Sequence, residues 1–186
     1  IKAFTFNFYK ESGLGAESLK YIPTILTNIP SSSKVHVKIG TLSDFSPFYT
    51  KDVFLGLKAI KSLVKLELSD HKQAENPPIY LGLGIISPHS LREFSLKLHS
   101  KYNDSNLIEL SRNLQRFSFL KNLTLDFAIW PKITQKGIDQ LADGLKSLTE
   151  LSKLHLSFSF DVSPYTFDNI LESLDDISFS NSMVTS

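Results

Sequence analysis

Histidine is the side chain best suited to metal binding or proton transfer near neutral pH. The chain contains five, which are His36, His71, His89, His99 and His155. A helical metal site needs two such ligands three or four positions apart, so that both point to one side, and no two of these histidines have that spacing. We therefore predict no metal site, and we interpret His36 and His155 as solvated or partner-contacting side chains.

Other patterns that carry chemistry are incomplete. Residues 81–84 read Leu-Gly-Leu-Gly, but the Lys-Ser/Thr pair of a phosphate-binding loop does not follow. No Gly-x-Ser-x-Gly motif presents a serine nucleophile, and the sequence has no cysteine for thiolate chemistry or disulfides. We predict no catalytic residue, no cofactor and no small-molecule substrate.

The clearest pattern is a repeated leucine phrase. Residues 120–125 read Leu-Lys-Asn-Leu-Thr-Leu, and residues 151–156 read Leu-Ser-Lys-Leu-His-Leu, 31 residues later. In a strand with one buried face, alternate side chains point the same way, so Leu-x-Leu places both leucines in the core. Between the phrases, residues 134–145 have apolar side chains at helical spacing behind Thr134, which suits a helix N-cap. The unit is a strand, a turn and a helix.

Both halves of this unit recur along the chain. In the helical half, Leu141 and Leu145 correspond to Leu110 and Leu114 one copy earlier. Each unit buries its leucines only by stacking on its neighbours. The seven copies of the strand pair are Phe4/Phe6, Val37/Ile39, Leu66/Leu68, Phe94/Leu96, Leu123/Leu125, Leu154/Leu156 and Ile177/Phe179.

This pattern of Leu-x-x-Leu-x-Leu, a turn and Gly-x-x-x-Leu-x-x-x-Leu resembles the ribonuclease-inhibitor type of leucine-rich repeat. The resemblance implies an α/β solenoid of about six to seven repeats, with a curved parallel sheet on the concave side and helices on the convex side. We assign residues 1–180 to this array and residues 181–186 to a polar tail. Because no polar cap is evident at either end, we interpret the chain as a fragment of a longer protein.

Helices are expected between the strands. The first, at residues 17–29, is interrupted by Pro23, which cannot donate a backbone hydrogen bond. Thr50 is the expected N-cap of the second, and Asn103 or Asp104 starts the one that precedes Leu114. The remaining expected helical ranges are 50–62, a brief turn at 79–86, and 163–174.

Composition limits the partners and the location. Lys plus Arg is 20 and Asp plus Glu is 19, so net charge gives no reason to expect nucleic acid. No apolar run approaches the roughly 20 residues that cross a bilayer, so we expect no membrane insertion. Secreted members of the family resembled often carry cysteine-rich caps, so an intracellular, cytoplasmic location is favoured.

The side chains that point out of the concave face form the candidate binding site. They are polar and of mixed sign, which suits a protein partner contacted over many small patches, whereas a nucleic-acid groove is basic with exposed rings. The alternative is a solvated sheet face, since no clear aromatic anchor is present. The candidates are His36, Lys38, Lys65, Glu67, Glu93, Lys97, Asn122, Asp126, Lys153 and His155.

These observations favour a non-catalytic protein–protein interaction scaffold, a subunit of a multi-subunit intracellular assembly. The resemblance implies cytoskeletal or ciliary complexes, ubiquitin-ligase receptors and innate-immune sensors as settings. An alternative is a GTPase-activating or other GTPase-regulating protein, because activators of a nuclear-transport GTPase use the same repeat. Only Arg92, Arg112 and Arg116 are available as arginines, and nothing around them resembles a signature of that class. A third reading is a spacer between other domains.

Overall fold

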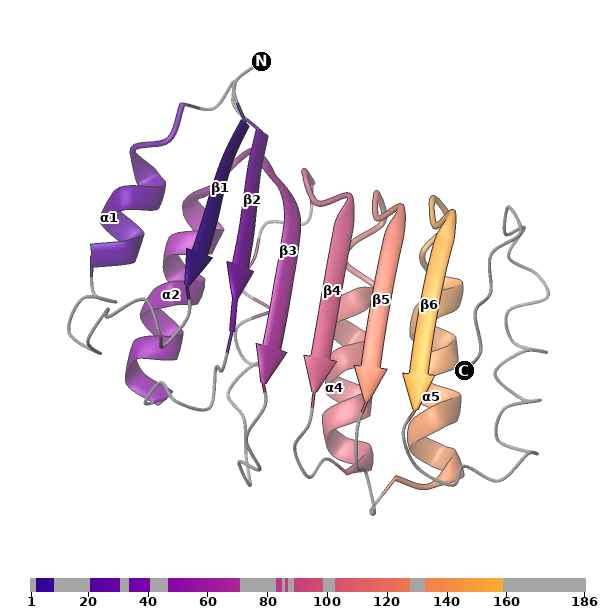
Figure 1. Ribbon diagram of the computed structural model, residues 1–186. Coiled ribbons are helices and arrows are strands. Elements are labelled where there is room, and N and C mark those ends of the chain that lie inside the picture. The colour runs from indigo at the N-terminus through magenta and orange to yellow at the C-terminus, as the bar shows by residue number, and fades with distance from the viewer. Residues whose placement is uncertain are drawn as a thin grey trace.

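A computed structural model describes residues 3–8, 21–30, 34–40, 47–70, 83–84, 86, 89–98, 103–127 and 133–158. Six parallel strands form one sheet in the order β1-β2-β3-β4-β5-β6 (Figure 1). The strands are β1 (Ala3–Phe8), β2 (Lys34–Ile39), β3 (Leu63–Asp70), β4 (Glu93–Leu98), β5 (Asn122–Phe127) and β6 (Lys153–Phe158). The helices are α1 (Ile22–Thr27), α2 (Pro47–Ala59), α4 (Asp104–Leu114) and α5 (Gln135–Lys146).

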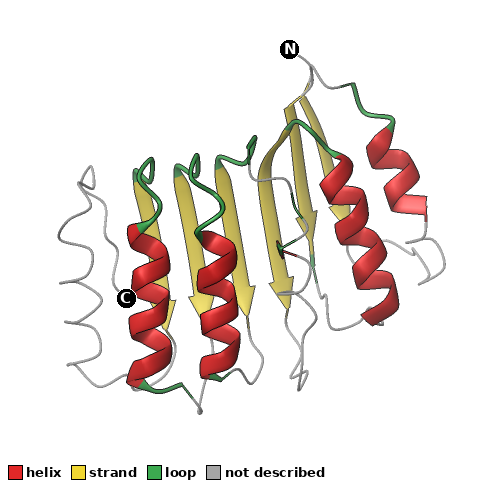
Figure 2. Cartoon of the chain, turned by 180° about the vertical axis from the view of Figure 1, so that it is seen from behind, coloured by secondary structure: helices red, strands yellow, loops and turns green. Residues whose placement is uncertain are grey.

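The molecule has two layers. The helices lie on one side of the sheet, as the views from the two sides show (Figures 1 and 2). The other side, which we call the open sheet face, carries no described helix and corresponds to the expected concave side. Strand and helix alternate along the chain, and sequential strands are neighbours in the sheet, which is the arrangement the repeats predict.

The core lies between the layers and repeats from strand to strand. Leu66, Phe94, Leu123 and Leu154 are paired in register across four strands, and each is at most 5% exposed. Parallel pairing in this register stacks like positions of successive repeats. The expected pairs from Val37/Ile39 to Leu154/Leu156 are aligned in this register. The first pair, Phe4/Phe6, lies in β1 but is shifted by two residues, since Phe6 pairs with Val37. Ile177/Phe179 lies outside the described residues.

The helix boundaries differ from those expected. Residues 47–50 are helical, so the prediction of Thr50 as an N-cap is wrong. Proline is favoured in the first turn of a helix, because an N–H group there would have no partner within the helix. Pro47 is the first residue of α2 and fits this preference. Pro23 likewise lies in the first turn of α1, which ends at Thr27 and not at the expected residue 29, while the expected helical residues 17–20 lie outside the described residues. The expected helix at 163–174 and the tail at 181–186 lie outside the described residues.

The start of α4 agrees with the prediction. Asn103 is the N-cap, and its side chain accepts a hydrogen bond from the Asn106 N–H at 3.2 Å. The Asn106 side chain accepts one from the Asn103 N–H at 3.0 Å, which completes a reciprocal capping box. Two of the backbone donors that a helix leaves unpaired at its start are thereby satisfied.

The start of α5 is held by the preceding helix. Thr134 occupies the N-cap position as expected, but its side chain makes no capping bond within α5. Instead Asp104 Oδ1 accepts from the Thr134 N–H at 2.8 Å, and Asp104 Oδ2 accepts from the Thr134 hydroxyl at 2.5 Å. One carboxylate in the first turn of α4 therefore links two consecutive repeats.

Two glycines let α4 and α5 approach closely. A Cβ atom at Gly144 would lie 3.0 Å from the Cα and Cβ of Ser111 and closer still to its hydroxyl oxygen. A Cβ atom at Gly137 would lie 2.5 Å from Asp104 Oδ1. The Ser111 hydroxyl also donates to the Gln140 carbonyl at 2.5 Å. The interface has no space for a side chain at either glycine.

The Gly144→Ala substitution tests this packing. Alanine normally stabilises a helix interior by about 1 kcal/mol over glycine, but here the added methyl group meets backbone that cannot rotate away. We expect the free energy of unfolding to fall by about 1–3 kcal/mol in urea denaturation. Lys136→Ala, at an exposed position of the same helix, should change it by less than about 0.5 kcal/mol. A more stable Gly144→Ala protein would contradict the close packing.

Removing the carboxylate that links the two repeats should loosen the start of α5. Asp104→Ala leaves the Thr134 N–H without its acceptor, and we expect a loss of about 1–2 kcal/mol in unfolding free energy. Amide hydrogen exchange at Thr134 should accelerate. Asp104→Asn keeps an acceptor oxygen and should lie between Asp104→Ala and the unsubstituted protein. Equal protection of Thr134 in all three proteins would show that the cap is not needed.

Candidate functional site on the open sheet face

Strand register brings the ten candidate residues together in three rows that cross the sheet. None of the ten is buried, whereas the strand positions between them carry the core side chains. The first row is His36, Lys65, Glu93, Asn122 and Lys153. The second is Lys38, Glu67, Ser95, Thr124 and His155, and the third is Ser69, Lys97, Asp126 and Ser157. Their shared face is confirmed, while their role in binding stays a prediction.

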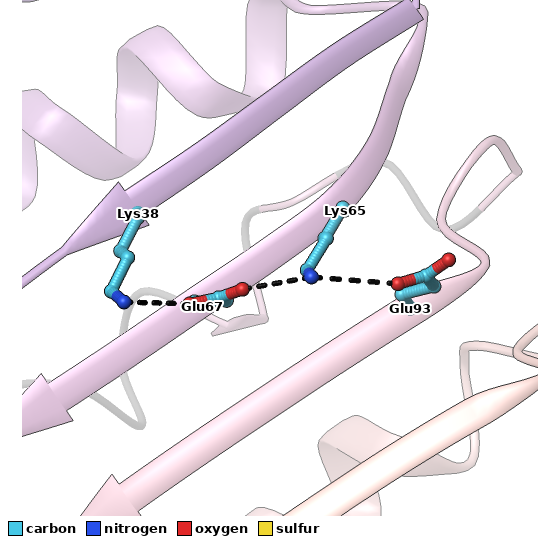
Figure 3. Close-up of polar contacts among 4 residues, drawn as sticks. All are labelled: Lys38, Lys65, Glu67 and Glu93. Carbon is cyan, nitrogen blue, oxygen red and sulfur yellow. Dashed lines mark ion pairs between the residues drawn. The ribbon is translucent and has the colours of Figure 1, made fainter. Parts of the chain in front are cut away.

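Four of these side chains form a chain of ion pairs over β2, β3 and β4 (Figure 3). Lys38 Nζ lies 3.2 Å from Glu67 Oε2, and Lys65 Nζ lies 2.9 Å from Glu67 Oε1. Lys65 Nζ also lies 3.7 Å from Glu93 Oε2. Charges therefore alternate along the chain of contacts, and each carboxylate of the chain faces at least one ammonium group.

The ion pairs shift the pKa values at the centre of this chain. The hydrogen bond from Lys65 to Glu67 raises the pKa of Lys65 above 10.5, against a smaller lowering by burial. Burial alone would raise the pKa of Glu67, but hydrogen bonds from Lys65 and Lys38, with their charges, together lower it below 4.5. Both groups are therefore held in their charged forms over a wide pH range.

An open concavity of about 290 Å³ lies beside the ion pairs, over β3, β4 and β5. Its lining residues include Lys65, Glu93, Lys97, Asn122 and Thr124, and its exposed surface is divided almost equally between polar and apolar atoms. In the described parts of the chain, Lys97 forms no ion pair, although Asp126 is its register partner on β5. Charged groups toward β5 and β6 thus differ from those over β2 to β4, which pair with one another.

The face does not assemble a catalytic group from its histidines. His36 is on β2 and His155 is on β6, so four strand spacings, roughly 19 Å, separate the two side chains. Among the described residues, no cluster of three or more His, Asp or Glu side chains has a metal-binding arrangement. No described helix is long and apolar enough to cross a membrane.

Sequence reasoning identified the members of the ion-pair chain but not their contacts. The signal was present, since aligning the repeated phrases places Lys38 opposite Glu67 and Lys65 opposite Glu93. The sequence analysis did not identify Phe119, which is 46% exposed in the loop before β5. The Arg92 guanidinium carbon lies 5.1 Å from the centre of that ring.

Comparison with known proteins agrees with this architecture. No family model matches the chain, and a search of the curated proteins finds no significant match. Among solved structures, the chain is similar to the tropomodulin C-terminal domain from Caenorhabditis elegans, with a TM-score of 0.61 and 13% sequence identity. The similarity covers 84% of this chain and 91% of that one. The chain is therefore an α/β repeat protein with a leucine-rich-repeat-like fold, and a likeness at this identity establishes the fold alone.

The ion-pair chain gives a pH-dependent contribution to stability. The share from Glu67, whose pKa is lowered, is present above pH 4.5 and is lost as the pH falls through its folded value. The share from Lys65, whose pKa is raised, is present below pH 10.5 and is lost as the pH rises through its folded value. We expect Lys65→Met to lower the unfolding free energy by about 1 kcal/mol or less at neutral pH, because the pairs are partly solvated.

Denaturant unfolding of Lys65→Met and the unsubstituted protein across pH and salt measures this contribution. The difference between the two should shrink at acid pH, at strongly alkaline pH and at high salt. Lys61→Met, at an exposed position just before β3, is the matched control and should show no such profile. A pH-independent difference would mean that Lys65 acts through packing of its aliphatic stem instead.

Proposed function

We propose that this chain is a non-catalytic scaffold that binds another protein through the open sheet face. The observation that carries the proposal is the set of three in-register rows, in which fourteen polar residues, with charges of both signs, share one face. Protein–protein interfaces contain many such hydrogen-bonding and charged groups, which surround a more closely packed and more apolar centre. A uniformly basic groove would instead suit nucleic acid.

The two halves of the face have different roles in this proposal. Over β2 to β4, the ion pairs of Lys65 with Glu67 and Glu93 satisfy the charges internally and hold the side chains in place. Over β4 to β6, Lys97, Asp126 and Lys153 form no ion pair with described residues. Binding is therefore centred on the β4 to β6 half, because charges there gain the most from an external counterpart.

The assembly is inferred by resemblance. The repeat type of the ribonuclease inhibitor, with its intracellular members in cytoskeletal and ciliary complexes, supports a subunit role in such a complex. The likeness to a tropomodulin domain is compatible with a cytoskeletal setting, as an analogy of fold. The proposal places the protein inside the cell among protein partners.

The contacts of two of the three arginines do not favour the GTPase-regulating alternative. Arg92 directs Nη1 at the carbonyl oxygens of His89 and Leu91, each at 3.1 Å. Arg116 directs Nη1 at the Gly84 carbonyl. An arginine that enters a GTPase active site must be free to reach a phosphate, and these two are tied to backbone. Unchanged GTP hydrolysis on addition of the chain to loaded small GTPases would reject the alternative.

Charge reversal on the β4 to β6 half tests the scaffold proposal. The tagged full-length protein that contains this chain is purified from its native cells by affinity capture, and the partners are identified by mass spectrometry. Lys97→Glu with Lys153→Glu should reduce recovery of the principal partner about tenfold, because each reversed charge meets a complementary group of the partner. Circular dichroism should show an unchanged fold.

The matched control reverses two exposed lysines on the helical side, Lys136→Glu and Lys146→Glu. This variant has the same change in net charge and should recover the partner normally. Equal recovery with both variants would argue against the open sheet face. Crosslinks from the partner that map only to α4 or α5 would place the contact on the helical side.

A further inference from the structure

Phe119 breaks the repeat pattern at an exposed position. It directly precedes the first leucine of its repeated phrase, Leu120, and the same position holds Ser62, Ser90 and Glu150 in the neighbouring copies. Its side chain is 46% exposed, while the leucine that follows is fully buried. Single exposed apolar residues are common on proteins, so the exposure of this ring alone would indicate no function. The charged residues near the ring supply the further observation.

Three cations lie along the loops that hold this ring. The guanidinium carbon of Arg92 is 5.1 Å from the ring centre, and its Nη1 is anchored to two carbonyl oxygens, so the group is held in position. Lys121 follows two residues after Phe119, and its N–H donates to the Arg92 carbonyl at 2.8 Å. Arg116 precedes it by three residues and is anchored to Gly84. One backbone-anchored guanidinium group thus lies over the exposed ring. A second guanidinium group and an ammonium group belong to residues three and two positions away from Phe119 in the same loop.

These loops lie at the end of the sheet where β4 and β5 begin (Figure 1). We call the surface formed by residues 89–92 and 115–121 the N-terminal rim. None of its three cations forms an ion pair with any carboxylate that the structure describes. Glu93, the acidic residue next to Arg92, faces Lys65 on the sheet instead. The rim is therefore positively charged in a chain whose formal net charge is only +1.

The helix dipole does not account for Arg92 and Lys121, although Arg116 directly follows the C-cap of α4. Basic residues near helix C-termini interact with the unpaired carbonyls there, which explains a cation such as Arg112 in the last turn of α4. Arg92 and Lys121 lie instead in the segments that enter β4 and β5, beyond the last helical turn. Like charges repel one another, and no described carboxylate pairs with these cations, so the charge in these two short segments favours an external anionic counterpart.

We propose that the N-terminal rim of β4 and β5 binds an acidic segment of a partner protein that places an apolar side chain against Phe119. Arginine recognises carboxylates through paired N–H groups, and each guanidinium here retains donors beyond the one bound to backbone. Aromatic residues, phenylalanine included, and arginine are both enriched at the buried centres of protein interfaces. A track for nucleic acid would need cations and rings repeated along a groove, which the rim does not offer.

This inference rests on the scaffold function and adds a second contact surface to it. The test is a titration of the isotopically labelled full chain with the synthetic peptide Glu-Glu-Leu-Glu-Glu-Phe-Glu-Glu, followed by amide chemical shifts. We expect shifts at residues 117–122 and 91–93 that disappear at high salt. The same peptide with Gln in place of Glu should cause none. Absence of rim shifts, or equal shifts with the Gln peptide, would overturn the proposal.

Two variants test the residues. Phe119→Ser installs the residue found at this position in two other repeats, and Lys121→Glu reverses one cation; each should weaken binding of the acidic peptide about tenfold. The matched controls are Leu55→Ser, at an apolar side chain 42% exposed on α2, and Lys136→Glu. They should bind as the unsubstituted protein does. A single-stranded oligothymidine that shifts the same amides more strongly than the peptide would overturn a protein partner in favour of nucleic acid.

The proposal for the rim and the proposal for the open sheet face can be rejected independently. If affinity capture from native cells loses the partner with Lys97→Glu and Lys153→Glu but keeps it with Phe119→Ser and Lys121→Glu, the scaffold function stands and the rim proposal falls. If the rim variant alone loses it, and the acidic peptide binds, the rim is the contact. Retention of the partner by both variants would contradict both surfaces.

Discussion

In-register parallel pairing of like positions is the constraint on which this molecule depends. Phe94 of β4 lies between Leu66 of β3 and Leu123 of β5, so each layer of the core is continuous from repeat to repeat. Since side chains alternate along a strand, the same register that stacks the leucines also stacks the polar residues on the other face. A slip of one residue would exchange the two faces. Stability and the candidate surface therefore share one cause.

The helices pack behind the strands, and neighbouring helices need more space between them than neighbouring strands do. Neighbouring strands lie about 4.8 Å apart, whereas packed helices lie about 8–10 Å apart, so helices normally splay and curve the sheet toward its open face. Gly137 and Gly144 reduce that difference between α4 and α5, because each takes the place where a Cβ atom would meet the other helix. Asp104 and Ser111 lie opposite them with the same seven-residue offset. Two helical turns of one repeat thus match two turns of the next.

The repeated phrase predicts the strands because its leucines occupy the buried positions. Features that depend on contacts between repeats cannot be predicted from the phrase. The cap of α5 is Asp104 from the previous helix, 30 residues away, and nothing near Thr134 in the sequence indicates it. On the open face the ten candidates were placed correctly from alternation alone. Which neighbours pair was not predictable, since Lys65 and Glu93 form an ion pair whereas Lys97 and Asp126, equally opposite in charge and in register, do not. Side-chain conformation decides between them.

Net charge is a poor guide to a repeat protein, because its surface is an ordered array of separate sites. A balance of +1 conceals a neutralised zone around Glu67, charged groups toward β6 that form no ion pair with described residues, and a cationic rim near Phe119. Each zone exists because the solenoid carries a given repeat position to a fixed height on the sheet. A residue that departs from its counterparts, as Phe119 departs from Ser62 and Ser90, therefore changes the surface at one known place. The fold constrains the core positions, and such departures are where a specific partner can be recognised.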